Sequence, residues 1–178
     1  MLGWKVTANL PDLQKYIVIA APHTSNWDFP LGILFGKAIN LQPHWMGKHT
    51  LFRWPYGWLF RYMGGIPVHR KRGDQNYMQQ MADRFERADR LVLALAPEGT
   101  RSKTDHWKTG FHSIARAANV PILIGYLDFG KKEVGVDGMF YASDDIEADF
   151  EIIRNFYKDR RGKNPENASL IRVRKKTD

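Results

Sequence analysis

Two short, continuously apolar segments constrain the fold of this 178-residue chain more than any other feature. Residues 16–21 read YIVIAA and residues 91–96 read LVLALA, and a proline directly follows each segment. Apolar runs of this length, without polar positions, are typical of strands that are buried on both faces of a sheet. Such strands occur mainly in parallel sheets that helices cover on both sides. The two segments therefore favour an α/β domain.

Helix and strand patterns alternate along the rest of the chain, without an internal repeat or a linker. This alternation favours one α/β domain with a central, mostly parallel or mixed β-sheet flanked by helices. We expect the domain to span residues 1–178, with a core at about 14–158 and a basic C-terminal tail at about 159–178. Further strands are predicted at 44–48, 66–68 and 120–127, and helices at 28–39, 74–88, 110–119 and 143–157.

Polar residues mark the expected helix starts. Ser25 or Asn26 is the expected N-cap of the first helix and Asp74 that of the second, because their side-chain oxygens can accept free N–H groups of a first turn. In the last helix, the acidic residues are expected in the first turn, where the helix dipole favours negative charge: Asp144, Asp145 and Glu147.

The charge balance indicates an acidic partner. The chain has 27 Lys and Arg against 19 Asp and Glu, a formal net charge of +8. Nucleic acid, an anionic bilayer surface, a phosphorylated small molecule or an acidic carrier protein would each fit this charge.

The absence of cysteine excludes several chemistries at once. The chain can form no disulfide, no thiolate metal site and no covalent acyl-thiol intermediate. The first residues also lack the pattern of a secretory signal, so a cytoplasmic location is expected. The longest apolar stretches, at 16–22 and 29–36, are much shorter than the roughly 18 to 20 residues that span a bilayer. Any membrane association is therefore expected to be peripheral.

His23 and Asp28 have a spacing suited to general-base chemistry. His23 follows the first apolar strand, after Pro22, and Asp28 stands at the start of the next helix. A carboxylate on one ring nitrogen fixes the histidine tautomer and leaves the other nitrogen free to take a proton from a hydroxyl. The alternative is a loop histidine beside an aspartate that serves only the helix dipole.

Nucleophilic serine and metal chemistry are both disfavoured. Ser25 lacks the glycine-flanked turn that presents a serine nucleophile above a sheet. The histidines have no metal-ligand spacing, so we expect neither a metal nor another cofactor. The six histidines are His23, His44, His49, His69, His106 and His112.

A second polar segment, PEGTRS at 97–102, follows the second apolar strand. Arg101 is always charged and can bind a phosphate through two parallel hydrogen bonds, while Gly99 allows close approach of the backbone. A solvated Glu98 and Arg101 on a loop is the alternative interpretation. Ligands of parallel α/β sheets bind beyond the carboxyl ends of strands, so the two polar segments are expected to share one cleft. A base beside an anion site suggests transfer chemistry on a phosphorylated acceptor.

Four segments together resemble the glycerophospholipid acyltransferase family. His23, Ser25 and Asp28 match its first block, HxSxxD, and residues 97–102 are close to its third. The stretch GIPVHR at 65–70 looks like the second block and VPI at 120–122 like the fourth. The four blocks stand in the family's order.

The resemblance implies direct acyl transfer from acyl-CoA or acyl-carrier protein, as co-substrate, to the free hydroxyl of a lysophospholipid such as 1-acyl-glycerol-3-phosphate. It implies no covalent enzyme intermediate, with His23 as general base and Asp28 as the residue that orients it. The substrate-binding residues that it implies are Ser25, Lys48, Arg70, Glu98, Gly99, Thr100, Arg101 and Lys108.

Two alternatives stay open. Pro22, Thr50 and Ala96 depart from the residues common in the family and lie near the expected substrate site, so the acceptor could be an amine or another lyso-lipid. From another class, a nucleic-acid-binding module would explain the basic charge. No recognised nucleic-acid motif is present, and that interpretation leaves the His23 and Arg101 segments unexplained, so we expect no nucleic-acid partner.

Residues 51–63 are unusually rich in aromatic side chains, with Arg53 and Arg61 among them. Pro55 should interrupt any helix in this segment. Amphipathic aromatics beside cations suit a bilayer interface, which predicts peripheral attachment to an anionic membrane surface on its inner, cytoplasmic face. Alternatively, the same side chains line the core and an acyl tunnel.

Overall fold

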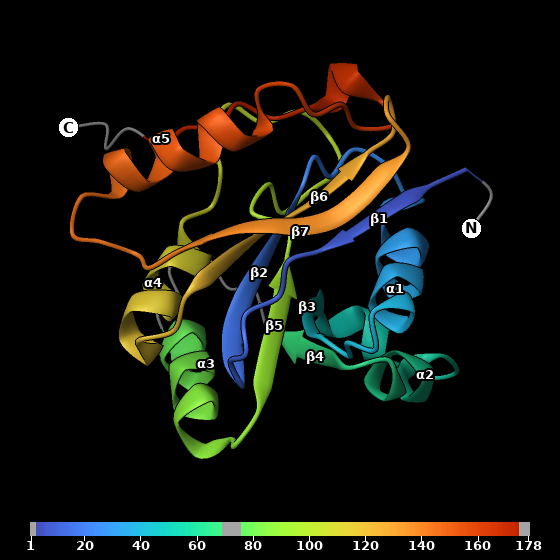
Figure 1. The fold of residues 1–178 in the computed structure, drawn as a ribbon. Helices are drawn as coiled ribbons and strands as arrows, with labels where there is room; N and C mark the ends of the chain where they lie inside the picture. The colour runs from blue at the N-terminus through green and yellow to red at the C-terminus, as the bar shows by residue number, and fades with distance from the viewer. Residues whose placement is uncertain (1–2, 69–75, 175–178) are drawn as a thin grey trace.

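A seven-stranded mixed sheet with helices on both faces forms the framework of the chain (Figure 1). The computed structural model describes residues 3–68 and 76–174. The strands, in the order β1-β7-β6-β2-β5-β3-β4 across the sheet, are β1 (Lys5–Ala8), β7 (Glu133–Phe140), β6 (Ile122–Asp128), β2 (Lys15–Ala21), β5 (Leu91–Leu95), β3 (His44–Lys48) and β4 (Gly65–Val68). The predicted α/β class with a mostly parallel sheet is confirmed.

Five neighbouring strands, from β6 to β4, run parallel, and β7 is antiparallel to β6. β1 pairs in parallel with β7 at the edge. The helices are α1 (Asp28–Ala38), α2 (Gly57–Tyr62), α3 (Asn76–Arg87), α4 (Gly110–Ala118) and α5 (Ile146–Tyr157), and two 3₁₀ turns are η1 (His49–Phe52) and η2 (Pro165–Asn167).

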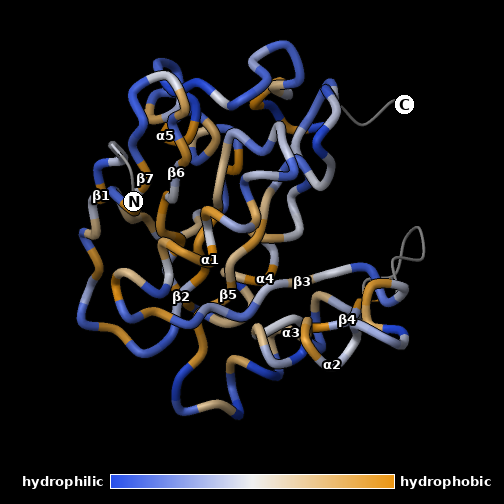
Figure 2. Tube along the Cα trace, turned by 90° about the vertical axis from the view of Figure 1, so that its right-hand side faces the viewer, coloured by the Kyte–Doolittle hydropathy of each residue, from blue (hydrophilic) through white to orange (hydrophobic). Residues whose placement is uncertain are grey.

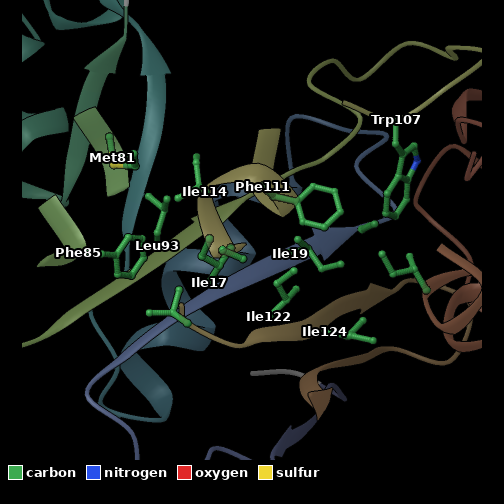
Figure 3. Packing of buried hydrophobic residues seen from close by; sticks show 14 of the residues in the cluster. Ile17, Ile19, Met81, Phe85, Leu93, Trp107, Phe111, Ile114, Ile122 and Ile124 are labelled. Carbon is green, nitrogen blue, oxygen red and sulfur yellow. The ribbon is translucent and has the colours of Figure 1, made fainter. Parts of the chain in front are cut away.

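The two faces of β2 pack against different layers. Ile17 and Ile19 face a core that includes side chains of α3, α4 and α5 (Figure 3). Tyr16 and Val18 point to the opposite face and belong to a second, smaller apolar cluster with Phe35 of α1. Because successive side chains of a strand alternate in direction, a strand buried on both faces needs apolar residues at every position. Figure 2 shows this hydrophobic colouring in the middle of the molecule along β2 and β5.

Adjacent strands β2 and β5 lead into helices on opposite faces of the sheet. β2 is followed by α1 on one face, and β5 by α4 on the other. The loops beyond their carboxyl ends therefore diverge and leave a crevice, which is the usual ligand position in open α/β sheets. Both polar segments of the sequence lie in these two loops.

Several observed boundaries differ from the predicted ones. The edge strand β1 and the antiparallel strand β7 were not predicted. Helix α1 begins at Asp28, but its N-cap position is Trp27, which provides no side-chain cap, so neither Ser25 nor Asn26 has the predicted capping role. Asp74 lies outside the described residues. Pro55 lies between η1 and α2, as predicted.

Helix α5 begins three residues later than predicted. Asp145 is its N-cap, and its carboxylate accepts the N–H groups of Glu147 and Ala148, so Asp144 precedes the helix instead of lying in its first turn. Beyond α5, the chain through residue 174 packs on the domain, and Ile171 and Val173 contact the larger core cluster.

Candidate active site

The loops after β2 and β5 are joined by a hydrogen bond between the two polar segments. The His23 N–H donates to Glu98 Oε1 at 2.5 Å. The register pairs Ile19 of β2 with Leu95 of β5, so both loops begin at the same edge of the sheet. The cleft predicted from two strand ends is thus built from segments 75 residues apart.

The Asp28 carboxylate contacts the His23 ring. The Asp28 Oδ2 atom lies 3.0 Å from His23 Nδ1. The same oxygen accepts the N–H groups of Thr24 and Ser25, each at 2.9 Å. The Asp28 side chain is only 3% exposed, whereas that of His23 is 21% exposed. A carboxylate that is fixed by two backbone donors orients the imidazole and leaves Nε2 as the nitrogen available for a proton.

His23 and Asp28 line a cavity of about 790 Å³ that extends between α1 and the sheet and also reaches Tyr77 of α3 and Phe111 of α4. Its inner part is apolar, since it lies between α1 and the strands, with walls that include Val18, Phe29, Ile33, Leu127 and Val136. Gly32 of α1 also lines this space, and a Cβ atom built there would meet no atom within 4 Å. Such a shape can hold a long apolar chain.

Cationic side chains surround the polar end of the cavity. Lys48 at the end of β3, Arg101 and Lys108 all line it, together with Gly99 and Thr100. Gly99 has a positive φ of +67°, and Lys108 Nζ lies 2.6 Å from the position of an added Cβ. The positive φ favours glycine here, and the absence of a side chain lets Lys108 lie across this turn.

Glu98 points away from the expected substrate position. Its side chain is almost fully buried and accepts the His23 N–H, while its neighbours Pro97 and Gly99 line the cavity. Burial raises the pKa of the Glu98 carboxyl above its usual value, and the His23 N–H, which stabilises the carboxylate, opposes that rise. Glu98 therefore supports the backbone that carries His23.

Of two further predicted substrate-binding residues, the structure describes only Ser25, which does not line the cavity. Ser25 is buried in the loop before α1, where its Oγ accepts the Trp27 N–H at 3.2 Å. Arg70 lies outside the described residues.

A second histidine and aspartate pair lies inside the protein. His112 Nε2 of α4 is 2.7 Å from Asp149 Oδ2 of α5, and both side chains are 5% exposed. Asp149 Oδ2 also accepts the Ser143 N–H, and its Oδ1 accepts the Ser143 hydroxyl. The sequence offered no spacing that would identify this pair, because 37 residues separate its members.

The aromatic segment has an inner and an outer side. The Phe52 and Phe60 rings pack against Trp45 of β3, Phe52 in a tilted and Phe60 in an edge-to-face arrangement. In contrast, Trp54 and Tyr62 are 92% and 86% exposed, and Tyr56, Trp58, Leu51 and Leu59 are exposed as well. Leu51 also lines the cavity, so this exposed surface adjoins the cavity. We call the exposed side chains of residues 51–62 the aromatic platform.

Residues 162–169 also contact the loops of the site, which the sequence did not predict. Asn164 hydrogen bonds to Thr24, next to His23, and the Ser169 N–H donates to Glu98. A polar stretch of this kind carries no periodicity that would place it beside a loop about 140 residues earlier.

Among residues 3–68 and 76–174, no group of three or more His, Asp or Glu side chains could hold a metal ion. Within the same residues, no helix combines the length and the apolar character that crossing a membrane requires.

A family model described as Acyltransferase matches residues 5–124, about two thirds of the chain. The match runs from β1 into the first residues of β6 and includes both loops of the site. The searches of curated proteins and of solved structures found no match.

Proposed function

Because the chain belongs to the glycerophospholipid acyltransferase family and is thus an acyltransferase, we propose that it acylates the free hydroxyl of a lysophospholipid such as 1-acyl-glycerol-3-phosphate. The donor is acyl-CoA or acyl-carrier protein. One observation carries this proposal: the His23 and Asp28 pair lies where an apolar cavity meets a rim of cations. The apolar cavity suits an acyl chain, the cations suit a phosphate, and the base between them suits a hydroxyl.

In this mechanism, His23 is the general base and Asp28 orients it. His23 Nδ1–H donates a hydrogen bond to Asp28, so Nε2 accepts the proton of the acceptor hydroxyl as that oxygen attacks the thioester carbonyl. The C–S bond then breaks, the ester C–O bond remains, and the proton passes from His23 to the departing thiolate. Asp28 stabilises the imidazolium between these steps. The thioester is already activated, so no covalent enzyme intermediate is needed.

The two ends of the cavity bind different parts of the substrates. The apolar part beneath α1 holds an acyl chain, which gains about 0.8 kcal/mol for each buried methylene. Arg101, Lys48 and Lys108 at the polar end attract phosphate, and Arg101 can bind it through two parallel hydrogen bonds.

The proposed location is the cytoplasm, with the enzyme attached to an anionic membrane surface by the aromatic platform. Trp and Tyr side chains favour the bilayer interface, and Arg53 and Arg61 within the same segment favour anionic lipids. The platform adjoins the cavity at Leu51, which would bring lipid substrates to the site without passage through water.

A panel of lyso-acceptors tests the reaction. Purified protein is incubated with one labelled acyl-CoA and with lysophosphatidate, neutral lyso-lipids or amine acceptors, and lipid mass spectrometry identifies the product. We expect a diacyl phospholipid from the phosphorylated acceptor. An acylated amine would identify the alternative acceptor, and no product from any acceptor or donor would contradict the proposal.

Arg101→Ala tests the phosphate contact. The KM for a phosphorylated acceptor should rise about tenfold, because a charge-assisted hydrogen bond is worth about 1.5 kcal/mol. Arg87→Ala on α3 removes an exposed cation outside the cavity lining and is the matched control. An unchanged KM in Arg101→Ala would remove the phosphate role.

Vesicle sedimentation tests the attachment. Trp54→Ala with Trp58→Ala should reduce binding to vesicles that contain phosphatidylglycerol, whereas Tyr141→Ala, an exposed aromatic outside the platform, should not. Equal binding by all three proteins would contradict this role of the platform.

A further inference from the structure

The loop that carries His23 is held from the far end of the chain. Residues 162–169 follow α5 and lie against the loop between β2 and α1, although the family match ends at residue 124. We call residues 162–169 the strap. Its contacts include Thr24, whose N–H donates to Asp28, and Glu98, which accepts the His23 N–H.

The first contact is a close approach of backbone to side chain at Gly162. This glycine is buried, and an added Cβ would lie 2.4 Å from Thr24 Oγ1 and 2.8 Å from Thr24 Cγ2. Both distances are far below van der Waals contact, so only glycine allows the strap to reach Thr24. Thr24 itself is almost completely buried.

The second contact is a pair of hydrogen bonds from Asn164 to the same residue. The Asn164 backbone N–H donates to Thr24 Oγ1 at 3.2 Å, and its side-chain amide donates to the Thr24 carbonyl at 3.0 Å. Thr24 in turn donates its N–H to Asp28 Oδ2, the oxygen that contacts the His23 ring. The strap thus fixes one of the two backbone donors that fix Asp28.

The third contact is to Glu98. The Ser169 N–H donates to Glu98 Oε2 at 3.4 Å, while Glu98 Oε1 accepts the His23 N–H. The strap therefore reaches His23 along two routes, through Thr24 and through Glu98.

Both ends of the strap are anchored by further contacts. Before it, the Arg161 carbonyl accepts the Phe129 N–H, and the Arg160 guanidinium lies 3.7 Å from the centre of the Tyr126 ring. After it, the Leu170 N–H donates to the Thr104 carbonyl and the Arg172 carbonyl accepts the Trp107 N–H. A segment that is fixed at both ends can hold the loop that it contacts, between β2 and α1, in a defined position.

We propose that the strap positions His23 for proton transfer, with Gly162 and Asn164 as positioning residues that act through Thr24. Displacement of a reacting group by about 1 Å can cost about 10²-fold in rate, so small movements of this loop are sufficient to matter. The expected effect on kcat rests on the proposed acyl transfer, whereas the expected effect on the position of the His23 loop does not.

Three variants test the strap: Gly162→Ala, Asn164→Ala and, as the matched control, Glu166→Ala. Glu166 is exposed on η2 within the same segment. We expect amide hydrogen exchange, followed by NMR, to accelerate about tenfold at His23, Thr24 and Ser25 in the first two variants, with α3 amides unchanged. In the acyl-transfer assay, kcat should fall about tenfold with KM within about twofold of wild type. Glu166→Ala should match the wild type in both measurements.

Thr24→Ala provides a double-variant test. It removes both atoms that an alanine at 162 would contact most closely, and it also removes the Oγ1 acceptor of the Asn164 N–H. The double variant with Gly162→Ala should therefore have the kcat of Thr24→Ala alone, without a further loss. Uniform acceleration of exchange across the protein, local acceleration without loss of kcat, or unchanged exchange would each overturn the positioning role. A wild type that transfers no acyl group would contradict the proposed function alone, because the exchange measurement still decides whether the strap holds the loop.

Discussion

The chain contains two histidine and aspartate pairs with similar separations and very different surroundings. His23 and Asp28 are 3.0 Å apart at a cavity, and His112 and Asp149 are 2.7 Å apart in the interior. In both pairs, the carboxylate also accepts backbone N–H groups. The difference is that the His23 ring faces a space that can hold a substrate, whereas the His112 ring is enclosed between helices. A short histidine to carboxylate distance therefore does not by itself mark a catalytic base.

His23→Ala should separate the two pairs most strongly. We expect kcat for acyl transfer to fall by about 10²- to 10⁴-fold, the usual contribution of a general base. The melting temperature should change little, because the ring is partly exposed at a cavity. Steady-state kinetics and thermal unfolding measure the two quantities. Wild-type turnover in this variant would show that another group takes the proton.

His112→Ala should give the opposite pattern. Removing one partner of a buried pair leaves the Asp149 charge poorly compensated and costs about 3 kcal/mol of unfolding free energy. Denaturant titration measures this loss, and kcat per folded molecule should stay near the wild-type value. If kcat per folded molecule falls as far as in His23→Ala, the His112 and Asp149 pair contributes to catalysis, and the proposed difference between the two pairs is wrong.

Gly32→Leu should fill part of the cavity that His23 lines, so that less open space remains beside His23, as is the case for the enclosed His112 ring. The leucine side chain enters the cavity, so kcat/KM for long-chain donors should fall about tenfold relative to short ones. Leucine also has the higher helix propensity, by somewhat under 1 kcal/mol, so α1 should remain folded. Competition between two acyl-CoA chain lengths measures the shift, with exposed Lys37→Ala on the same helix as control. An unchanged preference would place the acyl chain elsewhere.

Glu98→Gln should have the smallest effect, which is a change in pH dependence. The folded-state pKa of Glu98 lies above its ordinary value of 4.5. In the pH range above 4.5, the folded protein therefore holds a proton that the unfolded chain has lost, and stability decreases as pH rises toward the folded-state pKa. Glutamine does not titrate, so the difference in melting temperature between variant and wild type should grow in favour of the variant from pH 4 to 8. Glu86→Gln, at an exposed position of α3, is the matched control for the substitution itself.

The interior of the sheet could be predicted from the sequence because burial on both faces leaves a continuous apolar run. Strand β2 and strand β5 agree with their predicted positions within about one residue, and each ends near a proline. β1 and β7 could not be predicted in this way. β1 is short and mostly exposed, and β7 contains two glycines and two acidic residues, so both depend on pairing with neighbours.

The candidate site was partly predictable for the same reason. Strand ends place His23 and Glu98 at one edge, but loop residues have no periodic pattern that would show where their side chains point. Glu98 could equally have faced the cavity, and only the fold brings it to the His23 N–H. The strap was missed because its residues have neither apolar periodicity nor a recognisable spacing.

The apolar cavity wall beneath α1 lies on one side of the sheet, and most of the larger core cluster with α3, α4 and α5 lies on the other side, although the cavity also reaches Tyr77 and Phe111. For protein engineering, this arrangement supplies a natural partition. Libraries that vary the inward positions of α1, such as Phe29, Gly32 and Ile33, would alter the walls of the binding space and leave the larger folding core intact. The same scaffold could therefore accept new substrates through changes in one helix.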